Sequence, residues 1–385
     1  MNKQMLKLVP NQKTKGITLI ALVITIIILL ILASVSINMI FGENGLIRRA
    51  EDSKYATLAG EIKDDISIKL ASISVDQTNG KEKISGAEKR QRIINKLTDD
   101  GMLNNKYVTI SDSLIIIGNK YVISLSTGNW AIEAKSDEWN YQLDYIYTYQ
   151  NYTDTSLKET YSINEDGIDG RTGVVYGYNG TDTDITIPEY VTENGKVYPI
   201  TRIAQKWDGG FSGKNFKSVT IRDNIRIIEA WEFQQCKNLK KIYMGDGVEL
   251  LLEGTFASCI NLNQIYFSEA LKEIPANTFR FDNSLETISI PSNIKEIGKQ
   301  AFMYIGHAYE QTGLGYGSGI PPKLKKIEIS EGVEYIGEQA FVQANSVIYD
   351  LHLPSTIKTI ETEAFDKYGT INNKKVYKYD GTVLN

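Results

Sequence analysis

The chain has 385 residues, of which 42% are hydrophobic and 23% charged, proportions that are ordinary for a folded protein and exclude global disorder. A formal net charge of −5 at pH 7 argues against a nucleic-acid binder held by phosphate contacts. Two Cys and two His leave little material for a disulfide scaffold, a metal centre or acid–base catalysis. We therefore expect no enzyme, no cofactor and no nucleic-acid partner, and the length predicts two to three domains.

The N-terminal segment predicts a membrane anchor. Residues 17–41 carry no charge, and a helix of this length would extend about 37 Å, enough to cross a bilayer. The preceding leader holds Lys3, Lys7, Lys13 and Lys15 and no acidic residue, which places the N-terminus in the cytoplasm. The sequence thus predicts a single-pass membrane protein with leader 1–16, transmembrane helix 17–42 and a C-terminal domain that is extracellular.

The start of this apolar run resembles the leader of type IV prepilins. Residues 15–20 read KGITLI, a basic residue and a glycine followed at once by a hydrophobic helix. The resemblance implies cleavage between Gly16 and Ile17 by a prepilin peptidase, with pilin subunits as further partners. Prepilins usually carry Glu at the fifth mature position, where this chain has Ala21. A plain uncleaved anchor and an ordinary secretory signal are the alternatives.

Residues 43–135 predict a helix followed by a small antiparallel meander. Leu58, Ile62, Ile66 and Leu70 recur every four residues, as on one face of an amphipathic helix. A capping box over 85–88 begins a second helix, and short strands are predicted at 107–110, 114–117, 121–125 and 130–132. A long helix on such a meander resembles the pilin arrangement. Residues 136–172 form a polar, Tyr-rich connector.

The C-terminal half is built from repeats. Six units share apolar residues at offsets 0, 3, 5, 9, 12 and 17, and all 36 of these positions are apolar. A single unit cannot bury such a face, so the units must stack into a solenoid. We expect a strand over offsets 0–5, an irregular first coil over 185–203 and a terminal cap over 374–384. The units begin at Phe216, Leu239, Leu262, Leu285, Leu324 and Ile348, and their offset-17 residues are Phe233, Phe256, Phe279, Phe302, Phe341 and Phe365.

The repeat resembles the leucine-rich repeat of the BspA-like class of bacterial surface proteins. Residues 285–302 read LETISIPSNIKEIGKQAF, and residues 324–341 return the same pattern with Ser330 in place of Pro. The resemblance covers 173–385 and implies a β-rich leucine-rich-repeat solenoid behind an α+β, pilin-like N-terminal part. It also implies adhesion and protein recognition.

Candidate binding residues lie at offsets 2 and 4, which point away from the core of a strand whose offsets 3 and 5 are buried. Aromatic, charged and polar groups mix there, as in a recognition face. An ordinary solvated sheet is the alternative. The candidates on this face are Lys241, Tyr243, Gln264, Tyr266, Lys326, Glu328, Asp350 and His352.

Two further features interrupt the regular repeat. Leu324 follows Leu285 by 39 residues instead of 23, so a glycine-rich insertion, which holds Tyr309 and Tyr316 as further contact candidates, lies between these units. Cys236 and Cys259 both stand at offset 20 of adjacent units. Stacking would bring them close enough for a disulfide, although buried thiols are the more ordinary arrangement.

These observations predict a membrane-anchored protein of the bacterial cell surface whose repeats bind an extracellular protein or glycan, as an adhesin or interaction module. The alternative is a structural role as a minor pilin or pseudopilin of a filament or secretion machine. Neither reading requires catalysis or a bound metal.

Overall fold

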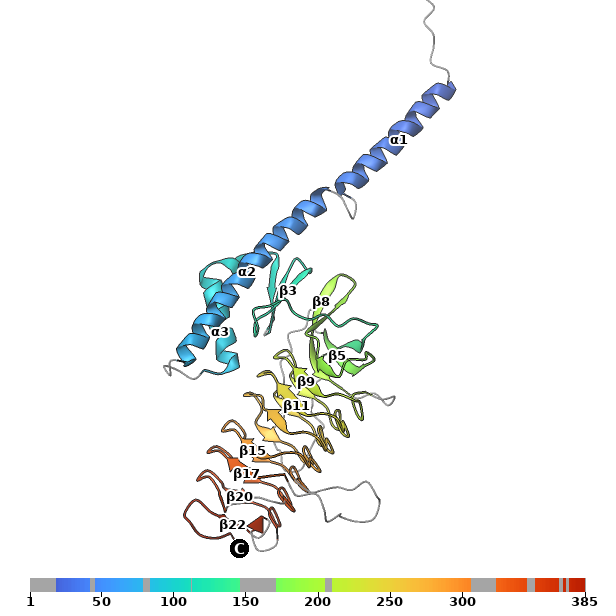
Figure 1. Ribbon diagram of the computed structural model, residues 1–385. Helices are drawn as coiled ribbons and strands as arrows, with labels where there is room; N and C mark the ends of the chain where they lie inside the picture. Colours follow the sequence, from blue (N-terminus) through green and yellow to red (C-terminus); the bar gives the residue numbers. More distant parts are fainter. Residues whose placement is uncertain are drawn as a thin grey trace, which may run out of the picture. The chain divides into compact units, whose positions relative to one another are not determined.

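The computed structural model describes residues 19–41, 46–78, 84–111, 113–145, 171–204, 210–305, 323–344, 350–366, 370–371 and 374–384. The chain divides into two compact units, Met1–Leu58 and Ala59–Asn385. The first unit holds a helix and the start of a second one, and the second unit holds the meander and the repeats (Figure 1). The predicted processing site, Gly16 and Ile17, lies outside the described residues.

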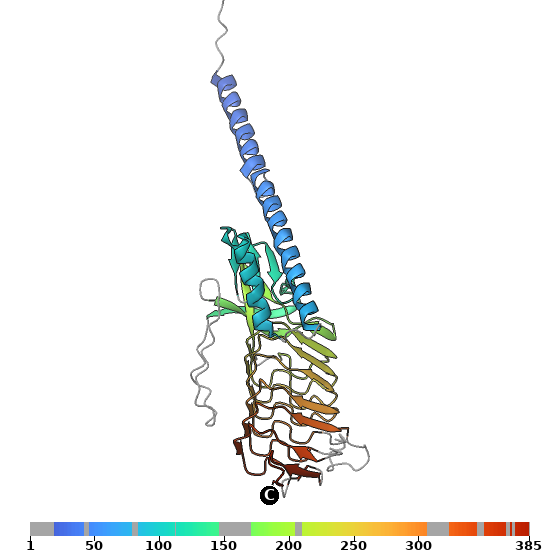
Figure 2. The same cartoon turned by 90° about the vertical axis from the view of Figure 1, so that its left-hand side faces the viewer.

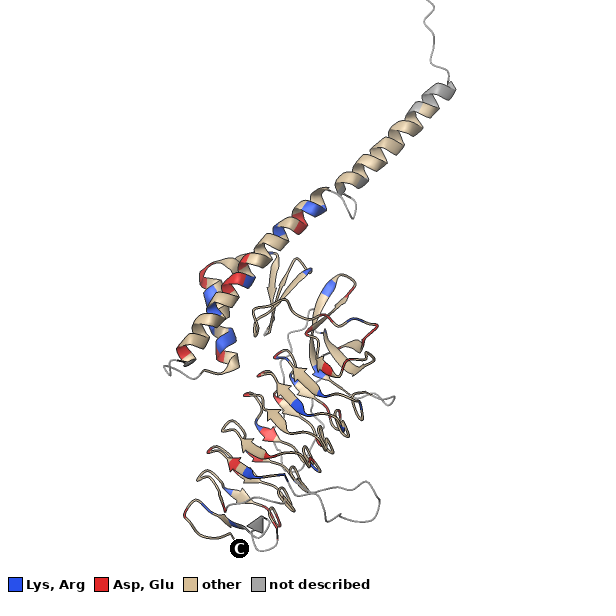
Figure 3. Ribbon diagram, in the orientation of Figure 1, with Lys and Arg blue, Asp and Glu red and all other residues tan. Residues whose placement is uncertain are grey.

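The first unit contains α1 (Leu19–Phe41), whose sequence has no charged residue. Its described part is tan in Figure 3. Many of its apolar side chains are exposed, among them Leu29 and Leu30. Within the described residues, no helix combines the length and the apolar character that crossing a membrane requires. The membrane span at 17–42 therefore stays a prediction.

The second unit begins inside α2 (Leu46–Thr78), whose predicted apolar stripe is buried at Ile62 and Ile66. Helix α3 (Gly86–Asp99) begins at the predicted capping box, where Ser85 Oγ accepts a hydrogen bond of 3.1 Å from Glu88 N. A single turn of 3-10 helix follows at Met102–Asn104.

Three of the four predicted meander strands form an antiparallel sheet. They are β1 (Val108–Ile110), β2 (Leu114–Ile117) and β3 (Tyr121–Ser124), in the order β1-β2-β3. The fourth prediction, 130–132, is wrong as a strand, because the pairing there is an isolated bridge between Trp130 and Ile123. Ser67 Oγ of α2 donates to Gly128 O at 3.3 Å, which ties the helix to the turn after β3.

Each repeat contributes one strand to each of two parallel columns (Figure 2). Alternation of buried and outward positions selects the first strand. The second is a shorter strand at offsets 11 and 12, whose offset-12 residue is apolar in every repeat. The first column holds β9 (Ser218–Ile221), β11 (Lys241–Met244), β13 (Gln264–Tyr266), β15 (Thr287–Ile290), β17 (Lys326–Ile329) and β19 (Leu351–His352). The second holds β10 (Ile227–Ile228), β12 (Leu250–Leu251), β14 (Glu273–Ile274), β16 (Glu296–Ile297), β18 (Tyr335–Ile336) and β20 (Thr359–Ile360).

The predicted irregular first coil is present. Strand β6 (Asp184–Thr186) pairs with β9 in the first column, and β8 (Lys196–Ile203) pairs with β10 in the second. Between them β7 (Tyr190–Glu193) folds back on β8 through a tight turn whose two residues, Asn194 and Gly195, both have positive φ angles.

The repeat sheet begins earlier in the chain than predicted. Strand β4 (Trp139–Tyr145) lies within the expected connector 136–172, yet it pairs with β5 (Arg171–Tyr178), which pairs in turn with β8. The Trp139 ring contacts Tyr178 at 4.7 Å and Phe211 at 6.3 Å between centroids, so these rings cover the first end of the core. At the other end, β22 (Lys374–Tyr377) pairs with β19 and with β21 (Thr370–Ile371), where a cap is predicted.

The offset-17 phenylalanines form a continuous buried column, as predicted. Successive ring centroids from Phe233 to Phe365 lie 5.3 to 5.8 Å apart, and the rings are nearly parallel. Their backbone N–H groups donate to the next coil, as from Phe302 to Ala340 O at 2.8 Å. One environment is thus repeated along the solenoid, and the repeats share a single hydrophobic core.

Candidate functional site

The outward face of the first strand column is the candidate site, and we call it the column-one face. Its residues point away from the core because side chains alternate along a strand and offsets 3 and 5 are buried. The residues at offsets 2 and 4 are half-buried or exposed throughout, as predicted. Parallel pairing in exact register then sets equivalent residues of neighbouring repeats side by side.

Strands β11 and β13 bring four of the predicted residues together. Lys241 stands opposite Gln264, and Tyr243 stands opposite Tyr266. The two tyrosine rings stack with centroids 4.7 Å apart and planes 9° from parallel. The Tyr266 side chain is 49% exposed, which is high for so large an apolar ring, so this pair offers an aromatic contact surface with hydroxyls at its edge.

Strands β15 and β17 carry a second, polar group on the same face. Lys326 and Glu328 form an ion pair with each other, and both side chains are about half exposed. Ser289 Oγ lies 3.4 Å from Glu328 Oε2, which extends the hydrogen-bonding surface across the strand pair. The two charges compensate one another, so this group offers directional hydrogen bonds and little net charge.

At the C-terminal end, the predicted candidates are partly engaged by the cap. Asp350 Oδ1 accepts a hydrogen bond of 2.8 Å from Lys375 N. The His352 ring stacks on Tyr377 with centroids 4.8 Å apart and planes 10° from parallel. Sequence reasoning missed Tyr377 because it counted aromatic residues within repeats and not in the cap strand that continues the column.

The column-one face is interrupted in the middle. Among the described strands, β13 does not pair with β15 and β17 does not pair with β19, so the first column is divided among three sheets. The break between β13 and β15 follows the one repeat whose offset-5 residue is aromatic, Phe267, whose ring packs edge-on against Phe279 at 5.8 Å. Ile265 and Phe267 are only half-buried there. The predicted candidates therefore form an aromatic group and a polar group rather than one ladder.

The remaining predicted residues have different outcomes. Tyr309 and Tyr316 lie outside the described residues. The possible disulfide is absent, because Cys236 and Cys259 are buried free thiols. Their Sγ atoms donate hydrogen bonds to Phe211 O at 3.2 Å and Phe233 O at 3.1 Å, respectively.

Asp282 continues the cysteine column in the next repeat. Its Oδ1 accepts a hydrogen bond of 2.8 Å from Cys259 N, and its side chain is fully buried. Burial raises the pKa of Asp282 and that of Cys259. These groups are held as neutral core residues. In the part of the chain that the structure describes, no three His, Cys, Asp or Glu side chains are grouped as a metal site would need.

Comparison with known proteins agrees with this architecture. Residues 207–309 and 321–378 match the family described as BspA type Leucine rich repeat region, in six copies. No curated protein matches the chain.

Among solved structures, a leucine-rich-repeat protein of T. pallidum is 18% identical, with a TM-score of 0.37 over 55% of this chain and 88% of that one. A leucine-rich-repeat protein of Bacteroides ovatus is also 18% identical, with a TM-score of 0.36 over 63% of this chain and 64% of that one. The pneumococcal vaccine antigen PcpA is 19% identical, with a TM-score of 0.24 over 54% and 77%. The residues that match the family, fewer than half of the chain, are similar to BspA-type leucine-rich repeats.

Proposed function

We propose that the chain is a binding module of the bacterial cell surface whose column-one face contacts an extracellular protein or glycan. The observation that carries the proposal is the stacked tyrosine pair of β11 and β13, in which Tyr266 is exposed and Tyr243 half-buried, flanked in register by Lys241 and Gln264. Tyrosines lose little conformational freedom on binding and supply both apolar area and a hydroxyl. The proposal assigns no catalytic chemistry to the chain.

The scaffold supports this role because it holds the face rigidly. On β11, Tyr243 sits between the buried Ile242 and Met244, and the offset-17 phenylalanines stack in the core behind the strands. A preorganised face loses less conformational entropy on binding than a mobile one. Proteins with BspA-type repeats are typically cell-surface proteins, which fits display to an outside ligand.

The second part of the proposal, that the repeats are anchored to a membrane, is supported by the sequence. The uncharged run 17–41 after a lysine-rich leader favours an anchor with the repeats outside. A filament role, as a minor pilin or pseudopilin, is the second candidate, because the exposed apolar side chains of α1, such as Leu29 and Leu30, would be covered by neighbouring helices. N-terminal sequencing of the native protein separates them: a mature start at methylated Ile17 together with a co-purifying pilin favours the filament, and an intact Met1 favours the plain anchor.

The binding role is tested with the full chain in mild detergent against a panel of cell-surface and matrix proteins and glycans. We expect Tyr243→Ala/Tyr266→Ala to weaken binding of the captured ligand about tenfold or more, as for aromatic residues at the centre of an interface. Tyr379→Ala is the matched control, since Tyr379 is an exposed tyrosine outside the column-one face. If the double variant keeps its circular dichroism spectrum and binds like the parent, the face is an ordinary solvated sheet.

A further inference from the structure

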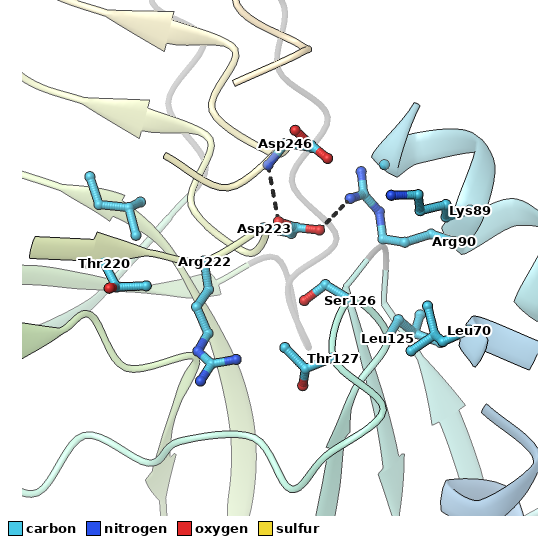
Figure 4. Close-up of a pocket in the computed structure, with 12 residues that line it drawn as sticks. Leu70, Lys89, Arg90, Leu125, Ser126, Thr127, Thr220, Arg222, Asp223 and Asp246 are labelled. Atoms are coloured by element: carbon cyan, nitrogen blue, oxygen red, sulfur yellow. Dashed lines mark hydrogen bonds and ion pairs between the residues drawn. The ribbon is translucent and has the colours of Figure 1, made fainter. Parts of the chain in front are cut away.

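A cavity of about 340 Å³ lies within the second unit, where the helices and meander meet the first repeats (Figure 4). It is lined by α2, by α3, by the turn after β3 and by the ends of β9 and β11. This volume lies at the small end of the range for ligand-binding pockets, which runs from about 300 to 1,000 Å³. None of the candidate residues named on the column-one face lines the cavity, although Thr220, which lines it, stands opposite Tyr243 on that face.

The carboxylates of the cavity are engaged by the protein. Asp223 Oδ2 accepts a hydrogen bond from Arg90 at 2.8 Å, and its Oδ1 accepts one from Asp246 N at 3.0 Å. Asp246 Oδ1 in turn accepts from Glu269 N at 3.4 Å. Burial, together with Asp223 and Glu269, raises the pKa of Asp246, while Lys89 opposes the rise. Arg90 is therefore paired within the wall, and the acids are poorly placed to attract a cationic ligand.

The other two cationic side chains of the lining, Arg222 and Lys89, are available to pair with an anionic ligand. Arg222 Nε is buried and has no hydrogen-bond partner. Its nearest carboxylate oxygen, Glu189 Oε2, is 3.7 Å away and already accepts a hydrogen bond of 3.0 Å from Ile132 N. That atom is covered by the protein, but the Arg222 side chain is 25% exposed, and a guanidinium binds carboxylates through two parallel N–H bonds. Lys89 forms no ion pair among the described residues, and Figure 4 shows it opposite Arg222.

Hydroxyl groups and short aliphatic side chains complete the lining. Thr127 and Thr220 line the cavity, as does Ser126. Leu70 and Leu125 supply apolar surface, and the described residues of the lining include no aromatic ring. A ligand that fits this inventory is small and rich in hydroxyls, and it carries one negative group.

We propose that this cavity binds a small hydroxylated carboxylic acid of the sugar-acid type. The carboxylate pairs with the terminal N–H groups of Arg222, whose side chain is 25% exposed. The ring hydroxyls bond to Thr127 and Thr220, and Lys89 closes the opposite side. This site stands independently of the protein or glycan ligand proposed for the column-one face.

The test is isothermal titration calorimetry of the full chain in mild detergent with D-glucuronate. D-Glucose serves as the matched probe without the carboxylate, and inorganic phosphate as an anion without the ring. The variants are Arg222→Gln, which removes the carboxylate partner, and Lys89→Gln, which leaves the Arg222–Glu189 pair intact. Lys240→Gln, an exposed lysine outside the cavity, and Tyr266→Ala, on the column-one face, are the controls.

We expect glucuronate to bind and glucose to bind at least about tenfold more weakly, because a charged hydrogen-bonded group contributes that much. Arg222→Gln should weaken glucuronate binding about tenfold or more and Lys89→Gln by a smaller factor, with both controls unchanged. The inference is overturned if glucuronate gives no heat, if glucose or phosphate binds as tightly, or if the folded Lys89 and Arg222 variants both bind like the parent. Loss of binding in Tyr266→Ala would also overturn it, because the two sites would then be one.

Discussion

Phe302→Ala tests the phenylalanine column at its centre. The Phe302 side chain is fully buried, and its ring lies 5.3 Å from Phe279 on one side and 5.3 Å from Phe341 on the other. The substitution removes the ring from between two parallel neighbours and leaves a cavity that the stacked coils cannot easily close. We expect the free energy of unfolding to fall by about 3 to 5 kcal/mol, the usual cost of removing a buried aromatic side chain.

The assay is equilibrium unfolding in guanidinium chloride, followed by far-ultraviolet circular dichroism. Tyr266→Ala is the control, because it deletes a ring of similar size that is 49% exposed and should cost about 1 kcal/mol or less. Equal stability of Phe302→Ala and the parent would refute the placement of these rings in one packed column. A loss of similar size in both variants would show that the column-one face is itself part of a core.

Three further predictions concern a buried carboxyl, two glycines and the thiols. Burial and Glu229 raise the pKa of Glu232 to about 9 from its ordinary 4.5, so between these pH values the folded chain holds a proton that the unfolded chain has released. The free energy of unfolding should therefore fall as the pH rises from 4.5 to about 9. Glu232→Gln should make the free energy of unfolding less dependent on pH in this range. Gly60→Ala should raise the melting temperature slightly, since a Cβ there meets nothing within 4 Å in a helix, whereas Gly247→Ala should lower it, since its Cβ would lie 1.8 Å from a backbone oxygen. The two buried cysteines should react with a thiol reagent only after unfolding, and reaction in the native state would contradict their burial.

The sequence predicts the core of the repeats well because one environment recurs in each coil. Every repeat places apolar residues at the same offsets, so a burial assignment that is ambiguous in one repeat is resolved by the equivalent residues of the others. Phe233, Phe256 and Phe279 are buried as the period requires. The capping box at Ser85 is equally readable, because it depends on residues three apart in the chain.

Other features depend on contacts that no local pattern encodes. Non-glycine residues adopt positive φ angles at offsets 15 and 19 of the repeats, as Asn277 and Phe281 do, with no shared residue type to reveal them. The docking of α3 on the repeats joins Arg90 to Asp223 and Gly86 N to Glu269 Oε2 at 3.0 Å. The acids at offset 7 of the first three repeats recur every 23 residues and could have signalled this surface, but their partner lies far away in the sequence.

The cavity beside α3 escaped sequence reasoning for the same reason. Its two available cations, Arg222 and Lys89, are 133 residues apart and come from different elements. Only the folded chain places both side chains in the lining of one cavity. The break between β13 and β15 is similar, since Phe267 satisfies the apolar pattern although its ring is larger than the residues at the same offset elsewhere.

The most direct test of the central claim is photo-cross-linking from the column-one face. A benzophenone amino acid is placed at position 264, outward on β13, or at position 338, an exposed site outside this face, and the full chain is irradiated with its captured ligand. We predict a covalent adduct from position 264 and none from position 338. Adducts from position 338 alone would show that the ligand contacts another surface, and the column-one face would then have no part in binding.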